Sequence, residues 1–154
     1  MKKKRIFLGL ALVFGVVQLI RPEKNSAPVT PGKDDLVTLY PPPPEVRRML
    51  ETACYDCHSN HTRYPWYAEI QPVGWWLASH VNEGKGDLNL SEFGTYTAKR
   101  QGSRFGRIAD VLTEHSMPLT SYTWIHRDAI FTAAQNNQLI DWAEAMQEKI
   151  EADK

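Results

Sequence analysis

The residues with the clearest capacity for chemistry form the stretch Cys54-Tyr55-Asp56-Cys57-His58. It contains both cysteines of the 154-residue chain, and a histidine directly follows the second. On a helix, two thiols three positions apart lie about one turn from each other. Three chemistries use such a pair: thiol–disulfide chemistry, metal binding, and covalent haem attachment through a C-x-x-C-H motif.

The surrounding sequence favours haem attachment. A thioredoxin-like redox pair opens the helix of a βαβ unit, and no strand–helix–strand pattern surrounds residues 54–58. A zinc site needs two further ligands, and His58 with His61 is a poor substitute for a second cysteine pair. We therefore predict one haem c, joined by thioethers to Cys54 and Cys57, with His58 as the proximal iron ligand. A thiol redox pair, a metal site and a structural disulfide are the alternatives.

The second axial ligand of the iron is expected further along the chain. Met117 is followed by Pro118 in a segment without helical periodicity, where a thioether is free to reach the distal face. We predict Met117 as the distal ligand, with His80 or His115 as alternatives and an open, five-coordinate iron as a third. Arg63 is a candidate partner for a haem propionate; a solvated arginine is the competing interpretation.

The N-terminus carries an export signal. Residues 2–5 are basic, and residues 6–20 form an apolar run. As a helix this run is about 22 Å long, shorter than a hydrocarbon core of roughly 30 Å, which favours a cleaved signal. The exit lacks a small-x-small cleavage site, and Arg21 and Lys24 could snorkel beside a short anchor, which favours an uncleaved anchor. We expect residues 1–24 to anchor the chain on the periplasmic side of a bacterial inner membrane, or to release it into the periplasm if cleaved.

Residues 25–44 are rich in proline and small polar residues and predict a linker, which leaves residues 45–154 as the domain. The formal charge of the whole chain is zero, but the part beyond residue 25 has 12 basic and 17 acidic residues. A mildly acidic domain argues against a nucleic-acid partner.

The sequence predicts an all-α domain with long loops. Val46, Met49, Leu50 and Ala53 recur at helical spacing within residues 45–54. A second helix is expected over 73–81, stopped by the glycine-rich residues 82–86, and a short one over 107–114. Residues 88–106 are expected to be a loop with one short helix. Thr132 and Gln135 form a capping box at the start of a C-terminal helix.

The order of these features resembles class I cytochromes c, in which the first and last helices cross near the haem. The blocks LETACYDCHSNHTRYPWYAEIQPVGWWLASHVNEGKGDLNLSEF and MPLTSYTWIHRDAIFTAAQNNQLIDWA are more closely similar to an exported bacterial haem-binding domain family common in Bacteroidota. The resemblance implies a small cytochrome c-like helical domain around one haem. It also implies attachment through Cys54 and Cys57, ligation by His58 and Met117, and a possible ligand role for His80.

Two functions follow from these expectations. The first is a membrane-tethered electron carrier that exchanges electrons with a redox partner protein in the periplasm or inner membrane. The second is a sensor or peroxidase-like enzyme with an open or displaceable sixth position, where His80 or His115 would supply acid–base chemistry. We expect the carrier, and therefore a binding protein rather than an enzyme.

Overall fold

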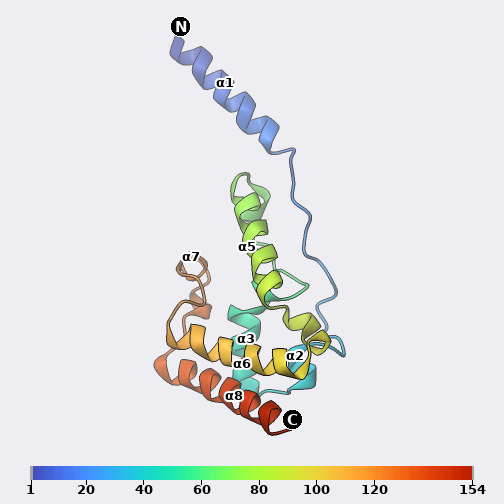
Figure 1. Ribbon diagram of the computed structural model, residues 1–154. Coiled ribbons are helices and arrows are strands. Elements are labelled where there is room, and N and C mark those ends of the chain that lie inside the picture. The colour runs from blue at the N-terminus through green and yellow to red at the C-terminus, as the bar shows by residue number, and fades with distance from the viewer. Residues whose placement is uncertain (1, 154) are drawn as a thin grey trace.

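The computed structural model describes residues 2–153, and every element it contains is helical (Figure 1). The α-helices are α1 Lys2–Val17, α2 Leu36–Leu39, α3 Pro44–Ala53, α4 Tyr55–His58, α5 Val73–Asp87, α6 Ala98–Thr113, α7 Thr120–Thr123 and α8 Ala133–Ala152. Three short 3-10 helices are η1 Trp66–Glu69, η2 Leu90–Thr95 and η3 Arg127–Ala129. Within residues 2–153 the only β-type pairing is an isolated bridge between Ser26 and His61. The predicted all-α class is confirmed.

The core forms between α6 and α8, which lie side by side and antiparallel (Figure 1). Gly102, early in α6, faces Ile150 near the end of α8, and Asn136 at the start of α8 donates to the Leu112 carbonyl near the end of α6. Helix α3 packs against α8. The apolar side chains buried between these helices include Met49, Leu50, Phe105, Ile108, Leu139, Trp142 and Ala143.

The first and last helices of the domain form as predicted. Pro44 occupies the first turn of α3, where a missing N–H costs nothing, and the predicted apolar face of α3 is buried. At α8 the Thr132 hydroxyl accepts from the Gln135 backbone N–H, while the Gln135 side chain accepts from the Thr132 N–H. Both helices are specified by residues within one or two turns, and these local signals were sufficient to predict where the helices form.

The prediction of a loop over residues 88–106 was wrong in its second half. Helix α6 starts at Ala98, with the Thr97 hydroxyl accepting from the Arg100 N–H at its N-terminus. Gly102 and Gly106 lower its intrinsic propensity, but both lie where α6 packs against α8. Burial of Phe105, Ile108 and Leu112 offsets the weak propensity, so the helix runs unbroken to Thr113.

The predicted stop of α5 at residues 82–86 was also wrong, because the helix continues to Asp87. Gly84 lies against the motif turn α4, where a Cβ atom would come within 2.8 Å of the Cys57 carbonyl oxygen. Here the glycine permits close packing of two backbones and does not end the helix. The C-terminal end of α5 is thereby held beside residues 54–58.

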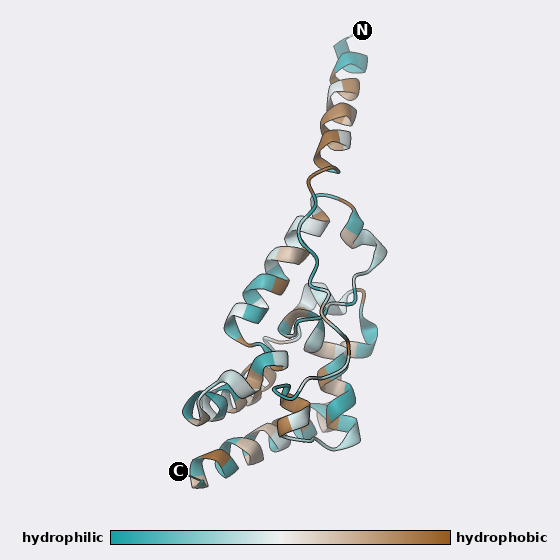
Figure 2. Cartoon of the chain, turned by 90° about the vertical axis from the view of Figure 1, so that its right-hand side faces the viewer, coloured by the Kyte–Doolittle hydropathy of each residue, from teal (hydrophilic) through white to brown (hydrophobic). Residues whose placement is uncertain are grey.

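The N-terminal segment forms the expected apolar helix, α1, which extends away from the domain with its side chains exposed (Figures 1 and 2). It has 16 residues, and none of the helices within residues 2–153 is long and apolar enough to cross a membrane. Inside the segment expected to be a linker, the Asp35 side chain caps α2, and Leu36 and Val37 are buried in the core.

Candidate haem-binding site

The cysteine motif forms one tight helical turn. Helix α3 ends at Ala53, and the N–H groups of Cys57 and His58 both bond the Cys54 carbonyl, at 3.2 and 2.9 Å. Both thiols are free. Burial and the neighbouring Cys57 raise the pKa of Cys54 to about 12, and burial and Asp56 raise the pKa of Cys57 to about 11. Because the nucleophile of a redox pair is a thiolate, two thiols with a raised pKa fit a redox pair poorly. Within residues 2–153, no group of three or more His, Cys, Asp or Glu side chains is placed to hold a metal ion.

A cavity of about 320 Å³ opens beside this turn. Its walls come from the end of α3, the motif, the end of α5, one face of α6, the loop 116–118 and Phe131. The largest group of lining side chains is aliphatic: Leu50, Leu88, Leu90, Ile108, Val111 and Leu112. Cys54, His58 and Met117 are also part of the lining, so three of the predicted site residues meet at one space. A concave apolar site with a few convergent polar groups is typical of a small-molecule or cofactor site.

His58 is oriented by the end of α5. Its Nδ1 lies 3.1 Å from the backbone carbonyl of Leu88, the residue directly after that helix. A carbonyl only accepts, so Nδ1 carries the proton, and in the neutral ring Nε2 then keeps a lone pair. Metal-ligating histidines are held in this way, because the outer hydrogen bond sets both the tautomer and the ring direction. The contact of Gly84 with Cys57 holds α5 where the Leu88 carbonyl can make this bond.

Met117 reaches the cavity through the turn that ends α6. The His115 N–H bonds the Leu112 carbonyl at 3.2 Å, and the Ser116 N–H bonds the Val111 carbonyl at 3.0 Å. With His115 at φ 53°, this is the pattern of a Schellman motif. The chain reverses there and lays Ser116 and Met117 against the cavity, with Met117 37 % exposed.

Two arginines that the sequence analysis missed complete the lining. Arg104 and Arg107 lie one turn apart on α6. Arg104 Nη1 pairs with Asp87 Oδ1 at 2.9 Å, but its buried Nε has no hydrogen-bond partner, the only such buried side-chain atom within residues 2–153. A buried guanidinium N–H requires an acceptor. A carboxylate on a bound cofactor would supply one, so the lining fits a haem with its propionates. The signal for these residues was the helical spacing of α6, which the prediction of a loop obscured.

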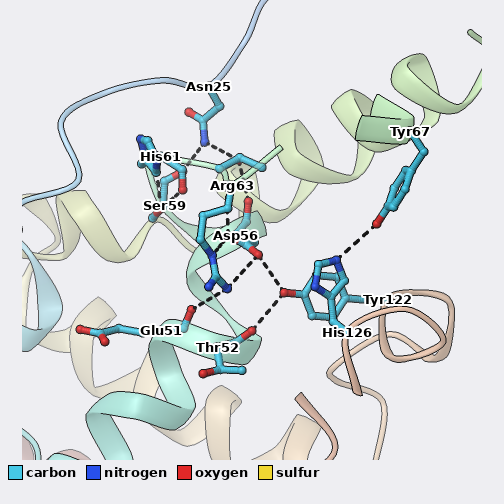
Figure 3. A network of polar contacts seen from close by, with 11 residues as sticks. Asn25, Glu51, Thr52, Asp56, Ser59, His61, Arg63, Tyr67, Tyr122 and His126 are labelled. Atoms are coloured by element: carbon cyan, nitrogen blue, oxygen red, sulfur yellow. Dashed lines mark hydrogen bonds and ion pairs between the residues drawn. The ribbon is translucent and has the colours of Figure 1, made fainter. Parts of the chain in front are cut away.

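The other predicted residues lie elsewhere. Arg63 pairs with Asp56 through Nε–Oδ1 at 3.0 Å and Nη2–Oδ2 at 3.2 Å (Figure 3). The His80 ring packs on Trp76 with centroids 4.3 Å apart, and its Nδ1 is bonded to the Trp76 carbonyl. His115 is exposed at the end of α6. None of these three lines the cavity, and neither does Cys57, which lies against Gly84 of α5.

A polar network joins the motif to the segment after Met117 (Figure 3). Asp56 is almost fully buried, and besides Arg63 it accepts from the Tyr122 hydroxyl at 2.8 Å. Burial and the nearby Asp56 carboxylate raise the pKa of Tyr122 far above its usual value, so the phenol remains a donor. Tyr122 also stacks on His126, whose Nε2 lies 3.3 Å from the Tyr67 hydroxyl. The sequence analysis did not identify this network.

Together, the all-helical fold and the His58 cavity define a small haem-protein domain. A family model described as a haem-binding domain matches residues 12–145, so the chain belongs to that family, and the predicted family resemblance is confirmed. Membership supports haem as the cofactor. Neither the curated proteins nor the solved structures contain a match.

Proposed function

We propose that the protein is a one-electron carrier with a single haem c, attached through Cys54 and Cys57 and ligated by His58 and Met117. When bound, such a group supplies an Fe(III)/Fe(II) couple whose potential is raised by histidine–methionine ligation. The observation that carries the proposal is the hydrogen bonding of the His58 ring. Its Nδ1 is bonded to the Leu88 carbonyl, its Nε2 is free, and Met117 lines the same cavity.

The remaining lining suits electron exchange. The aliphatic side chains of α3 and α6 exclude water, and Arg104 and Arg107 place two positive charges beside the site against the one negative charge of Asp87. Both features disfavour the more positive, oxidised form of a bound iron centre and so raise its potential.

The residues that line the cavity favour an electron carrier over an enzyme or a sensor. Within the described residues, His58 is the only histidine that lines the cavity, and the histidines expected to act as acid–base groups lie outside it. Peroxide or gas chemistry would want such a group on the distal side. Besides His58, the lining has Met117, Ser116 and aliphatic side chains, and its charged residues are Asp87, Arg104 and Arg107, of which Arg104 is paired with Asp87.

We further propose that the domain works on the periplasmic side of the inner membrane, tethered by residues 1–24, with a redox protein as its partner. Two features support this location. The N-terminus has basic residues followed by an apolar helix, and the chain contains a C-x-x-C-H motif, to which haem is attached after export.

The test compares Met117→Leu with Met146→Leu in the purified holoprotein. Met146 is a partly buried methionine on α8 that does not line the cavity, so it controls for the loss of a thioether elsewhere. We expect the far-red absorption band of methionine-ligated ferric haem in the wild type and in Met146→Leu, and its loss in Met117→Leu. A wild type without that band, or a Met117→Leu protein that keeps it, would overturn the distal assignment.

Covalent attachment is tested separately with a Cys54→Ser/Cys57→Ser variant. We expect haem to stay with the wild-type polypeptide on a denaturing gel and to leave the variant. Haem that stays on the variant polypeptide would contradict attachment through these thiols.

A further inference from the structure

Four of the five tryptophans are on the surface. Trp66 is 76 % exposed, Trp124 67 %, Trp76 48 % and Trp75 36 %, whereas Trp142 lies in the core. Tryptophan is usually well buried, so one exposed side chain would be unremarkable but four call for an explanation. Exposed aliphatic side chains lie in the same segments: Ile70, Val73 and Ile125.

These side chains gather at one end of the domain, which we call the aromatic end: Trp66, Ile70, Val73, Trp75, Trp76, Trp124 and Ile125. The Tyr67–His126 contact of 3.3 Å brings η1 beside the segment after α7, and Trp66 packs edge-on against Tyr67. Trp75 and Trp76 are in the first turn of α5, which packs against η1. The surface is therefore built from two segments that are far apart in the chain, residues 66–76 and residues 124–125.

The apolar helix α1 leaves the domain from this end (Figure 1). Trp75 Nε1 donates to the Ile20 carbonyl at 2.7 Å. Gln18 and Gln71 exchange two hydrogen bonds, of 2.8 and 3.2 Å, between side chain and backbone. Arg21 and Lys24 both form ion pairs with Glu69. Figure 2 shows α1 as the most continuously apolar part of the chain, standing on this end.

We propose that the aromatic end rests on the surface of a lipid bilayer. Indole rings favour the boundary between hydrocarbon and headgroups, because they combine a large apolar face with one polar N–H. Arg21 and Lys24 lie beside the indole rings, through their ion pairs with Glu69, at the depth where cations contact lipid phosphates. The continuity of this surface with the exposed apolar face of α1 favours lipid over a protein as the occupant. The inference rests on the membrane location proposed above and adds which face of the domain meets the membrane.

Along α5, this arrangement sets the Leu88 end of the helix away from the bilayer. Trp75 is in the first turn of α5, while Leu88, whose carbonyl holds His58, follows its last residue. At 1.5 Å per residue, these two positions are roughly 20 Å apart along the helix axis. A soluble redox partner could therefore reach the site from the side opposite the membrane.

The test uses the full-length holoprotein reconstituted in phospholipid vesicles that contain a lipid with a photoactivatable headgroup. Crosslinked peptides are identified by mass spectrometry. We expect label on α1, on residues 66–76 and on residues 124–125, and none on α8. A Trp66→Ser/Trp124→Ser variant should lose label at those positions while its far-UV circular dichroism is unchanged. Val29→Ser, which changes an equally exposed apolar residue in the segment before α2, is the matched control and should label as the wild type does.

The outcomes separate the two proposals. Label confined to α1 would overturn the bilayer contact of the aromatic end and leave the membrane location standing. The same pattern, with a redox protein protecting Trp66 and Trp124 from oxidative labelling, would assign this surface to that protein. Absence of all label, with the chain outside the vesicle fraction, would overturn both the location and the inference.

Discussion

The hydroxyl of Tyr122 donates a hydrogen bond of 2.8 Å to Oδ2 of Asp56 (Figure 3). Asp56 lies between the two cysteines of the attachment motif, and Tyr122 follows Met117 by five residues. The same hydroxyl lies 3.0 Å from the Thr52 carbonyl at the end of α3. One side chain therefore ties the segment that carries the proposed distal ligand to the turn that carries the proximal ligand.

The first prediction concerns this bond. Tyr122→Phe keeps the ring but removes the donor to a buried carboxylate, which we expect to lower the free energy of unfolding by about 1–3 kcal/mol. Tyr40→Phe is the control, because the Tyr40 hydroxyl donates to the neutral side chain of Gln101 and should cost only about 0.5–1.5 kcal/mol. Denaturant unfolding of the two holoproteins measures both values. A smaller loss for Tyr122→Phe than for Tyr40→Phe would contradict the role given to Asp56.

The second prediction separates two glycines of α5. Gly84→Ala places a methyl 2.8 Å from the Cys57 carbonyl oxygen, and we expect this overpacking to destabilise the fold by about 1–3 kcal/mol. Gly86 has no atom within 4 Å of the corresponding position. Gly86→Ala should therefore stabilise the helix by about 0.5–1 kcal/mol. Thermal unfolding of both variants gives the comparison, and equal effects would show that α5 does not pack on the motif as described.

The third prediction concerns the charge of Arg104. Its guanidinium disfavours the oxidised iron centre, so Arg104→Gln should lower the reduction potential by an amount on the order of tens of millivolts. Arg100→Gln removes an arginine of the same helix that stacks on Tyr96 and does not line the cavity, and its potential should match the wild type. Spectroelectrochemical titration of the three proteins provides the readout. An unchanged potential in Arg104→Gln would place the cofactor away from this side chain.

The fourth prediction concerns the turn before Met117. His115 has a φ of 53°, which costs a residue with a Cβ atom about 1–2 kcal/mol, so His115→Gly should raise the free energy of unfolding by up to about 1 kcal/mol. A β-branched side chain is disfavoured there, so His115→Val should lower it. Because His115 does not line the cavity, the absorption spectrum should be unchanged in both. A shifted spectrum in His115→Gly would restore His115 as a candidate ligand.

The parts of the fold that could be predicted rest on short-range signals. Pro44 in the first turn of α3 and the capping box of Thr132 and Gln135 act within one helical turn, so the local sequence contains all the information they need. The turn formed by Cys54 to His58 is likewise specified by adjacent residues. Their spacing predicted a single helical turn, and the backbone forms one, with the N–H groups of Cys57 and His58 both bonded to the Cys54 carbonyl.

The errors occurred where packing overrides local preference. Gly102, Gly106 and Gly84 indicate weak or ended helices when they are considered residue by residue, but each lies where a helix meets another element closely. The apolar contacts of α6 with α8 outweigh the propensity cost, which is only about 1 kcal/mol per glycine. Because α6 was expected to be partly loop, the arginines on its cavity face were not identified.

The sequence by itself determined the helical class, the C-x-x-C-H motif and the candidate ligands. Only the tertiary structure decided which of them share a site. His58 meets Leu88 across 30 residues, and Asp56 meets Tyr122 across 66. Met117 was placed in the cavity, and His80 and His115 outside it, by the way α5 and α6 pack. Such long-range contacts depend on the geometry of whole helices, which no local pattern of residues specifies.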